Sequence, residues 1–471
     1  MKKIALIFIF FLASIPLYAQ TNVSGGVFSN TTWTLSNSPY IVTGPVVVFP
    51  NVTLTIEPGV VVKIQEKSTN TSEQVYIEIR GKLVAKGTST SPISFIPETA
   101  PTLGTNQIWQ GINVKTALGG NIDMDYFVFN NSFYGISYDD ILLDTLTFNE
   151  CKFNYNNYTL SINTNFVLNS CEFYNNGTTN SLMYLYGSVL ANNCIYKNNF
   201  ACMSMVANGV NVTNSVFENN QSCFIQISGS FKNCLFKDNN IVFQENGFLD
   251  IDSSSFINNN IGINELIGGR VINSSFQNNT LALSVGANTI IEKNNISNNN
   301  VGLALVGKFI NGMILPFVRE NKICDNSLYN LENKSDFNLG LENNCFCLDD
   351  SLAIDQKIFD GYDDITRGLI NFATYDSLCL TIKQRFIKIN LGTGMFEEKR
   401  VASVFPNPFV DHLNLVSEDK SIEWRVMDVT GREILSFISN SINYEADLSS
   451  LVKGVYILIS NEYKPIKVIK N

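Results

Sequence analysis

Apolar and polar positions along the chain repeat with a period near 20 residues from about residue 147 onward. In each repeat an aromatic or aliphatic side chain, called the anchor below, is closely followed by a pair of asparagines. The anchors, spaced 19 to 23 residues apart, are Phe153, Phe173, Tyr196, Phe217, Phe236, Phe256, Phe276 and Ile296. This period is too short for helical-hairpin repeats and predicts the coils of a β-helix, each with three short strands.

Positions at fixed distances from the anchors predict which side chains face the core. The residues five and seven after an anchor are apolar in several coils, as at Ile241 and Phe243 or Ile261 and Ile263. This alternation predicts a strand with one buried face. The residue five before an anchor is also apolar, as at Ile251. Stacked coils would place like side chains on like, about 4.8 Å apart.

The asparagine pairs predict turns that close the anchor strand. Asparagine tolerates left-handed backbone angles and forms local hydrogen bonds, and in a stacked array its amide can also bond to the next coil. We expect these pairs, such as Asn258-Asn259, to form structural ladders, with a second ladder at Asn214, Asn233 and Asn273. The alternative is a polar binding stripe along the helix.

Ten cysteines raise the question of disulfides. Four of them, at Cys151, Cys171, Cys194 and Cys234, lie two before an anchor, where other coils carry serine. The serines indicate that this position accommodates a small residue that faces inward. Because buried cysteine behaves as a small hydrophobic residue, we expect these cysteines to be free thiols. Cys202 and Cys223 lie six after an anchor, and the pattern does not predict which way they face.

The N-terminus predicts a signal peptide at residues 1–19. Lys2 and Lys3 precede an apolar run at residues 4–12, and Ala19 favours cleavage before Gln20. The run is shorter than the ~20 residues of a membrane span, so after cleavage we expect no transmembrane segment. Net charge is −10, or −12 without the two lysines, which argues against a nucleic-acid partner because phosphate binding needs a basic face.

Both ends of the predicted helix resemble a family of bacterial β-helix surface proteins. The first match runs through residues 38–42, 53–60, 81–88, 91–95 and 109–112, and the second through residues 343–347, 358–365 and 368–372. The resemblance implies capping segments that cover the open core and its edge strand. The family usually has two tryptophans and a glycine where this chain has Cys345-Phe346-Cys347. Residues 351–359 could form a short capping helix.

Four further cysteines, Cys324, Cys345, Cys347 and Cys379, gather in this closing region. The oxidising destination of an exported chain favours one or two disulfides, whose pairing the sequence leaves open. Free thiols are the second interpretation. A zinc site is the third, but the spacing fits no zinc motif. We therefore expect no metal and no other cofactor.

The 20-residue period ends before a charged stretch at residues 380–400, which we interpret as a linker. Residues 412–415, 422–427 and 455–459 then alternate as short antiparallel strands of a small β-sandwich. Residues 401–471 resemble the type A sorting domain of type IX secretion, through segments 404–409, 427–433, 447–456 and 464–470.

The resemblance implies export by the type IX secretion machinery, through the periplasm to the cell surface or the medium. The residues that carry it, as the sorting signal, are Pro406, Asn407, Pro408, Gly431, Gly454, Tyr456 and Lys470. An ordinary immunoglobulin-like module is the alternative.

Parallel β-helices often carry polysaccharide-degrading enzymes, but a fold alone does not establish a function. Glycoside hydrolysis needs two facing carboxylates; the candidates are Asp123, Asp125, Asp139, Asp140, Asp144, Asp250 and Asp252. A lyase needs a base, for which Arg270 is the best candidate. Because Arg270 and Asp250 each lie six before successive anchors, we expect an ion pair between adjacent coils. The single histidine, His412, lies in the C-terminal domain.

The sequence thus predicts an all-β chain, with a right-handed parallel β-helix at 20–379 and an immunoglobulin-like antiparallel β-sandwich at 401–471. We expect a monomeric, non-enzymatic adhesin, or a protein that binds a polysaccharide or host glycan, and we assign no catalytic residue. The alternatives are a polysaccharide lyase, glycoside hydrolase or epimerase, and a purely structural spacer.

Overall fold

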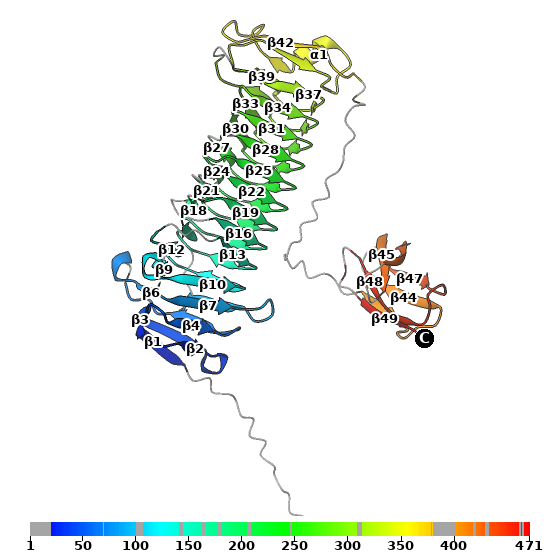
Figure 1. Cartoon of the computed structure of the whole chain (residues 1–471). Helices are drawn as coiled ribbons and strands as arrows, with labels where there is room; N and C mark the ends of the chain where they lie inside the picture. The colour runs from blue at the N-terminus through cyan, green and yellow to red at the C-terminus, as the bar shows by residue number, and fades with distance from the viewer. Residues whose placement is uncertain are drawn as a thin grey trace, which may run out of the picture. The chain divides into compact units, whose positions relative to one another are not determined.

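The computed structural model describes residues 20–471 except 69, 100–106, 141–144, 163–164, 178–180, 186, 205–208, 245–246, 309–312, 378, 380–401, 418–420, 429–432, 461–462 and 464–465. The predicted signal peptide and linker lie outside the described residues. The chain divides into two compact units, Met1–Gly392 and Thr393–Asn471. The first unit is a parallel β-helix whose coils stack along one axis (Figure 1).

The anchor strands stack in parallel to form one face of the helix, here called the anchor face. From the N-terminal end the face contains β5 (Val61–Ile64), β8 (Ile93–Pro97), β11 (Phe127–Asn130), β14 (Lys152–Asn154), β17 (Glu172–Tyr174), β20 (Ile195–Lys197), β23 (Val216–Glu218), β26 (Leu235–Lys237), β29 (Ser255–Ile257), β32 (Ser275–Gln277), β35 (Asn295–Ser297) and β38 (Lys322–Cys324).

The strands that follow the anchors form the second face. They are β6 (Val75–Ile79), β9 (Trp109–Val114), β12 (Ile136–Tyr138), β15 (Leu160–Ile162), β18 (Ser181–Leu185), β21 (Ala201–Ser204), β24 (Ser222–Ile225), β27 (Ile241–Gln244), β30 (Ile261–Leu266), β33 (Leu281–Val285), β36 (Val301–Leu305), β39 (Tyr329–Asn333) and β41 (Ile358–Phe359). At the N-terminal end the long β3 (Tyr40–Val48) pairs with both β5 and β6, and β1 (Thr21–Val27) pairs with β3.

The third face closes each coil. It contains β2 (Thr31–Trp33), β4 (Thr53–Ile56), β7 (Lys82–Lys86) and β10 (Asn121–Asp125) in one sheet, and β13 (Leu146–Asn149), β16 (Phe166–Asn169), β19 (Val189–Asn192), β22 (Val210–Thr213), β25 (Gly229–Lys232), β28 (Leu249–Asp252), β31 (Gly269–Ile272), β34 (Thr289–Glu292), β37 (Phe317–Arg319), β40 (Leu339–Glu342) and β42 (Ile370–Thr374) in the next.

The anchors stack in register through the centre of the helix, as predicted. Phe236, Phe256 and Phe276 occupy paired positions and have no exposed surface. The ring centroid of Phe256 lies 4.7 Å from that of Phe236 and 4.3 Å from that of Phe276. Offset stacking of buried rings adds to the stabilisation from their burial, so this column ties successive coils together.

The predicted alternation after the anchors is wrong at one position. Ile241 and Ile261, five after an anchor, are only half-buried, whereas positions six and seven are both buried, as at Val242 and Phe243. The inter-coil ladder pairs Ile241 with Ile261 and Phe243 with Ile263 and skips the residue between them. The strand therefore bends at position six, and two consecutive side chains face the core.

Non-repetitive elements cover parts of the helix. Short 3₁₀ turns occur at η1 (Leu35–Asn37), η2 (Thr71–Glu73) and η3 (Thr116–Leu118). The predicted capping helix is present but short: α1 spans Ser351–Asp355, and the chain returns to strand at β41. Asp350 caps it by accepting a 2.8 Å hydrogen bond from the N–H of Ala353.

The second unit contains two small antiparallel sheets. One consists of β43 (Ser403–Phe405), β44 (His412–Val416) and β47 (Asn443–Asp447), and the other of β46 (Glu433–Ser439), β45 (Ile422–Asp428), β48 (Gly454–Ile459) and β49 (Ile466–Lys470). The three predicted strands correspond to β44, β45 and β48. Trp424 and Tyr463 are fully buried in its core. Within the residues described, no helix is long and apolar enough to cross a membrane.

Candidate functional site

The corner between the anchor face and the second face carries three parallel rows of mostly polar side chains, two, three and four positions after each anchor. We call it the asparagine corner. Residues of the first row have left-handed backbone angles, with φ between 54° and 60°, the conformation that asparagine and aspartate tolerate best. They are Asn131, Tyr155, Asn175, Asn198, Asn219, Asp238, Asn258, Asn278, Asn298 and Asp325.

The middle row is buried and hydrogen-bonded along the helix axis. Asn239 donates its backbone N–H and its side-chain amide to Oδ1 of Asn259 at 2.9 and 3.0 Å, and donates again to the carbonyl of Phe217 at 2.8 Å. The same pattern links Asn156, Asn176, Asn199, Asn220, Asn239, Asn259, Asn279, Asn299 and Asn326. Because its bonds run within the fold, this row is structural.

Most side chains of the two outer rows are accessible to solvent; an exception is Asn157, four after Phe153, which is buried. In the first row Asn198 donates to Asn175 at 3.1 Å, and in the third row Asn260 donates to Asn240 at 3.0 Å. Each side-chain amide has two N–H donors and two acceptor lone pairs, so one bond along a row leaves capacity for a ligand. The third row was missed in the sequence, although its residues directly follow each asparagine pair.

A hollow of about 610 Å³ lies on this corner. It is lined by residues of all three rows and by Gly177. They are Asn198, Asn219, Asp238 and Asn258 of the first row, Asn199, Asn220 and Asn239 of the middle row, and Phe200, Gln221, Asn240 and Asn260 of the third row. It is a shallow depression, open to solvent along the corner rather than an enclosed cavity. Phe200 is the one aromatic residue in this lining, and 40% of its surface is exposed.

More aromatic rings lie on the same corner in earlier coils. The ring of Phe133, four after the buried Phe129, lies 4.7 Å from that of Tyr134 and 6.2 Å from that of Tyr158. The N–H of Tyr158 donates to the carbonyl of Phe133, which places the two residues on neighbouring coils. The corner therefore combines exposed amides with exposed aromatic surface.

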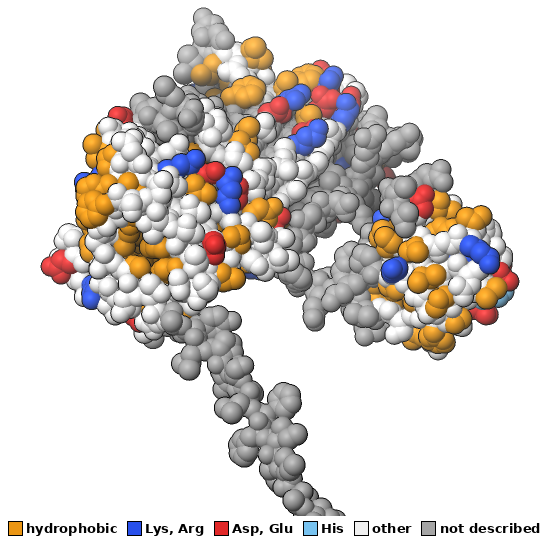
Figure 2. Space-filling model, turned by 60° about the horizontal axis from the view of Figure 1, so that its bottom comes forward, with side chains coloured by type: hydrophobic (Ala, Val, Ile, Leu, Met, Phe, Trp, Pro, Cys, Tyr) orange, Lys and Arg blue, Asp and Glu red, His pale blue; other side chains and the backbone are white. Residues whose placement is uncertain are grey.

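Oppositely charged side chains of the third face pair with one another. Arg270 donates two hydrogen bonds to Asp250, at 2.6 and 2.9 Å, which confirms the predicted ion pair. Hydrogen bonding to Asp250 raises the pKa of Arg270 above its ordinary value, so Arg270 remains charged and is a poor base. Lys232 similarly lies 3.6 Å from Asp252. In the view of Figure 2, uncharged surface dominates and several basic groups lie beside acidic ones.

The aspartates of the N-terminal coils have partners in the fold. Asp123 forms a 2.9 Å ion pair with Lys86, and Asp125 accepts hydrogen bonds from the backbone and side chain of Asn149 at 3.0 and 2.8 Å. Hydrogen bonding to Asp123 raises the pKa of Lys86. Both aspartates thus take part in contacts between neighbouring coils.

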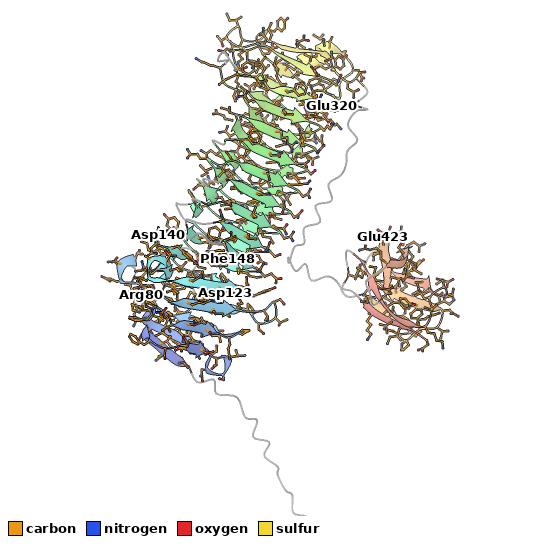
Figure 3. The ribbon with its side chains drawn as sticks, in the orientation of Figure 1. Arg80, Asp123, Asp140, Phe148, Glu320 and Glu423 are labelled. Carbon is orange, nitrogen blue, oxygen red and sulfur yellow. A yellow bond between two sulfur atoms is a disulfide. The ribbon has the colours of Figure 1, made fainter. Side chains whose placement is uncertain are left out.

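The remaining candidate carboxylates do not converge on these two. Asp123 belongs to β10 of the third face, whereas Asp139 and Asp140 follow β12 of the second face (Figure 3). Asp139 accepts hydrogen bonds from the backbone and hydroxyl of Thr116. Asp144 lies outside the described residues. Asp123 and Asp125 share β10, and Asp250 and Asp252 share β28, but each of these four carboxylates is engaged by a side chain of a neighbouring coil.

The position two before each anchor is a second buried row. Backbone N–H groups donate along it to side-chain oxygens of the next coil, as from Cys194 to Ser215 at 3.0 Å and from Ser274 to Asn294 at 2.9 Å. The predicted inward facing of this position is confirmed. The thiols of Cys151, Cys171, Cys194 and Cys234 are buried and free, and so are those of Cys202 and Cys223, whose facing the sequence left open.

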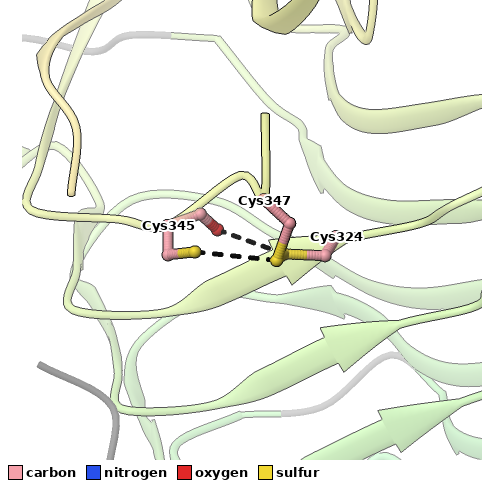
Figure 4. Close-up of side chains that lie close together, drawn as sticks. All are labelled: Cys324, Cys345 and Cys347. Carbon is pink, nitrogen blue, oxygen red and sulfur yellow. Dashed lines mark hydrogen bonds between the residues drawn. A yellow bond between two sulfur atoms is a disulfide. The ribbon is translucent and has the colours of Figure 1, made fainter. Parts of the chain in front are cut away.

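The four closing cysteines form one cluster. The structure joins Cys324 to Cys347 and Cys345 to Cys379. Figure 4 shows the sulfur of Cys345 beside the Cys324–Cys347 bridge; the sulfurs of Cys345 and Cys347 lie 3.7 Å apart. The two bridges are therefore adjacent. Three of these sulfurs are close enough to share a metal ion, but a cysteine in a disulfide has no thiolate to offer.

In the C-terminal unit, two residues of the predicted sorting signal bind to neighbouring segments. The amide of Asn407 donates to the carbonyl of Lys467 at 2.8 Å, and its oxygen accepts from the N–H of Ile469 at 2.9 Å. The buried ammonium of Lys470 lies 2.9 Å from Asp411 and also donates to the carbonyl of Val410. These contacts hold the last strand against the opening segment.

The other members of that set have different positions. Pro406 and Pro408 are exposed on either side of Asn407. The Tyr456 hydroxyl donates to the carbonyl of Val452 at 2.9 Å, and its ring lies against Gly454. Gly431 lies outside the described residues. The single histidine, His412, is exposed in β44.

A family model matches part of each of the two units. Residues 403–470 match the model described as a secretion system C-terminal sorting domain, and residues 25–117 match the pectate-lyase-like beta-helix domain. No curated protein matches the chain. The sorting domain indicates secretion by the type IX system, to the cell surface or beyond. The chain thus carries a type IX secretion sorting domain at its C-terminal end and a segment similar to the pectate-lyase-like β-helix domain at residues 25–117.

Proposed function

We propose that this exported protein binds glycans without cleaving them and that the asparagine corner is its binding surface. The observation that carries the proposal is the hollow of about 610 Å³ between the two outer rows. Its lining is almost entirely amide, with one aromatic ring in Phe200 and one carboxylate in Asp238.

Amides and rings match the chemistry of sugars. A glycan offers many hydroxyl groups that both donate and accept hydrogen bonds, and a carboxamide does the same. The C–H face of a pyranose is apolar and can pack on an exposed ring such as Phe200. Rigid coils hold these groups in place, so little conformational freedom is lost on binding.

Two features favour binding over cleavage. The described candidate carboxylates of β10 and β28 are each engaged by a side chain of a neighbouring coil, whereas glycoside hydrolysis needs two carboxylates free to act across one bond. Arg270, the candidate base of a lyase, is engaged by Asp250. A base must be able to lose its proton near the working pH, and this ion pair opposes that loss.

The test uses the mature chain, residues 20–471, with a panel of plant, algal and animal polysaccharides. Retention in affinity electrophoresis is expected for at least one of them, with no reducing ends and no unsaturated uronates released over a long incubation. Sustained product release would establish an enzyme instead. If no polysaccharide is retained and the circular dichroism spectrum shows an intact β-rich fold, the protein would instead be a purely structural spacer.

A further inference from the structure

We infer that the ligand is a neutral, extended polysaccharide that lies parallel to the helix axis across several coils, with one sugar packed on Phe200. This inference rests on the proposed function and adds the class of glycan and its direction. Three properties of the asparagine corner support it: its charge, its repeat and the position of its aromatic ring.

The charge of the corner disfavours acidic glycans. Among the described residues that line the hollow there is no Lys, Arg or His, and the one charged group is Asp238. The ammonium of Lys237, the residue before Asp238, is shared between Asp238 at 3.1 Å and Glu218 at 3.3 Å. A uronate or sulfate placed here would meet a carboxylate and amides with no unpaired cation. A neutral sugar meets no such repulsion.

The repeat of the corner fits an extended chain. Each outer row presents one side chain per coil, and coils are stacked about 4.8 Å apart. In the third row Gln221, Asn240, Asn260, Thr280 and Asn300 continue beyond Phe200 without a charged residue. A ligand lying along the axis meets a side chain of each outer row in every coil, and most of these are amides, whereas a ligand lying across it meets only one set.

Backbone hydrogen bonds hold Phe200 in place, immediately before this run of third-row residues. Its N–H donates to the carbonyl of Asn176, and its own carbonyl accepts from the N–H of Ser222. The ring is therefore presented from a coil bonded on both sides, although it is 40% exposed. The exposed part of this ring is available to pack against the apolar face of a sugar.

The experiment measures dissociation constants of the mature chain for neutral glucans, mannans and xylans and for polygalacturonate and alginate. Phe200→Ala is expected to weaken binding of the neutral ligand about tenfold, through loss of the ring contact. Asn260→Ala tests the corner independently of Phe200. Arg270→Gln, on the third face, is the matched control, and circular dichroism and melting curves verify that each variant is folded.

The outcomes separate the two proposals. Neutral binding that falls in Phe200→Ala and Asn260→Ala but not in Arg270→Gln supports the inference. Binding of acidic glycans only, or neutral binding changed by Arg270→Gln and not by the corner variants, overturns the inference and leaves glycan binding in place. If no glycan is retained, the proposed function itself is wrong.

Discussion

The side-chain oxygen of Asn279 accepts two hydrogen bonds from Asn259, one from the backbone N–H at 2.9 Å and one from the side-chain amide at 3.0 Å. Asn259 in turn accepts the same pair from Asn239. Each buried asparagine therefore closes its own turn and joins two neighbouring coils. Burial without these partners would leave several polar groups unsatisfied.

Asn259→Ala is expected to destabilise the helix by about 2–4 kcal/mol, because it leaves the buried N–H donors of Asn239 and the carbonyl of Phe236 without their hydrogen-bond partner. Urea unfolding followed by circular dichroism measures the loss. Asn260→Ala, at the exposed neighbouring position, should change the free energy of unfolding by less than about 0.5 kcal/mol. Equal effects of the two variants would contradict the assignment.

Phe256→Ala should destabilise the helix by about 3–5 kcal/mol, since it opens a cavity between the rings of Phe236 and Phe276. Phe248→Ala is the matched control because that ring is 61% exposed. Thermal melting of both variants against the parent protein measures the difference. A similar melting temperature for all three would show that the aromatic column adds little stability.

The disulfide cluster predicts two linked peptide pairs in the secreted protein, Cys324 with Cys347 and Cys345 with Cys379. Peptide mapping by mass spectrometry without reduction checks them. Replacing both Cys324 and Cys347 with serine should cost about 3 kcal/mol, because the bridge closes a 23-residue separation. Other linkages, or four thiols that all react with iodoacetamide, would disprove this pairing.

Burial raises the pKa of the Cys234 thiol from 9.0 to about 12. The unfolded chain therefore releases this proton above pH 9 while the folded chain keeps it, and stability is expected to fall between pH 9 and pH 12. One thiol contributes a slope of up to about 1.4 kcal/mol per pH unit.

Cys234→Ser should flatten this slope while preserving the fold, since Ser215 and Ser254 fill the same position in adjacent coils. Free energies of unfolding at pH 8 to 11 make the comparison. An unchanged alkaline slope would mean that the thiol ionises equally in both states.

Removal of residues 403–470 should keep the protein inside the cell envelope, because this segment is the sorting domain. Cell fractionation and immunoblotting of the producing bacterium follow its location. The Arg270→Gln variant, which leaves the C-terminal unit intact, should still reach the surface or the medium. Normal export of the truncated chain would contradict this role.

Much of the architecture could be predicted because its determinants are local. The anchors, the small residues two before them and the strands of the C-terminal unit follow from side-chain patterns within one coil or one hairpin. The Arg270–Asp250 pair was predictable too, since equal distances from successive anchors place two residues in register. Stacking identical coils converts a sequence period directly into spatial neighbours.

What the sequence by itself determined is the coil, its inward-facing anchors and its C-terminal sorting domain. Only the tertiary structure decided that Val242 faces the core beside Phe243, that the second asparagine of each pair is buried while the first is exposed, and which cysteines are joined. The physical reason is that these properties depend on where each coil bends and on how turns from different coils stack. The period of the sequence predicts the repeating coil, but contacts between coils decide whether a residue at a corner faces the core or the solvent.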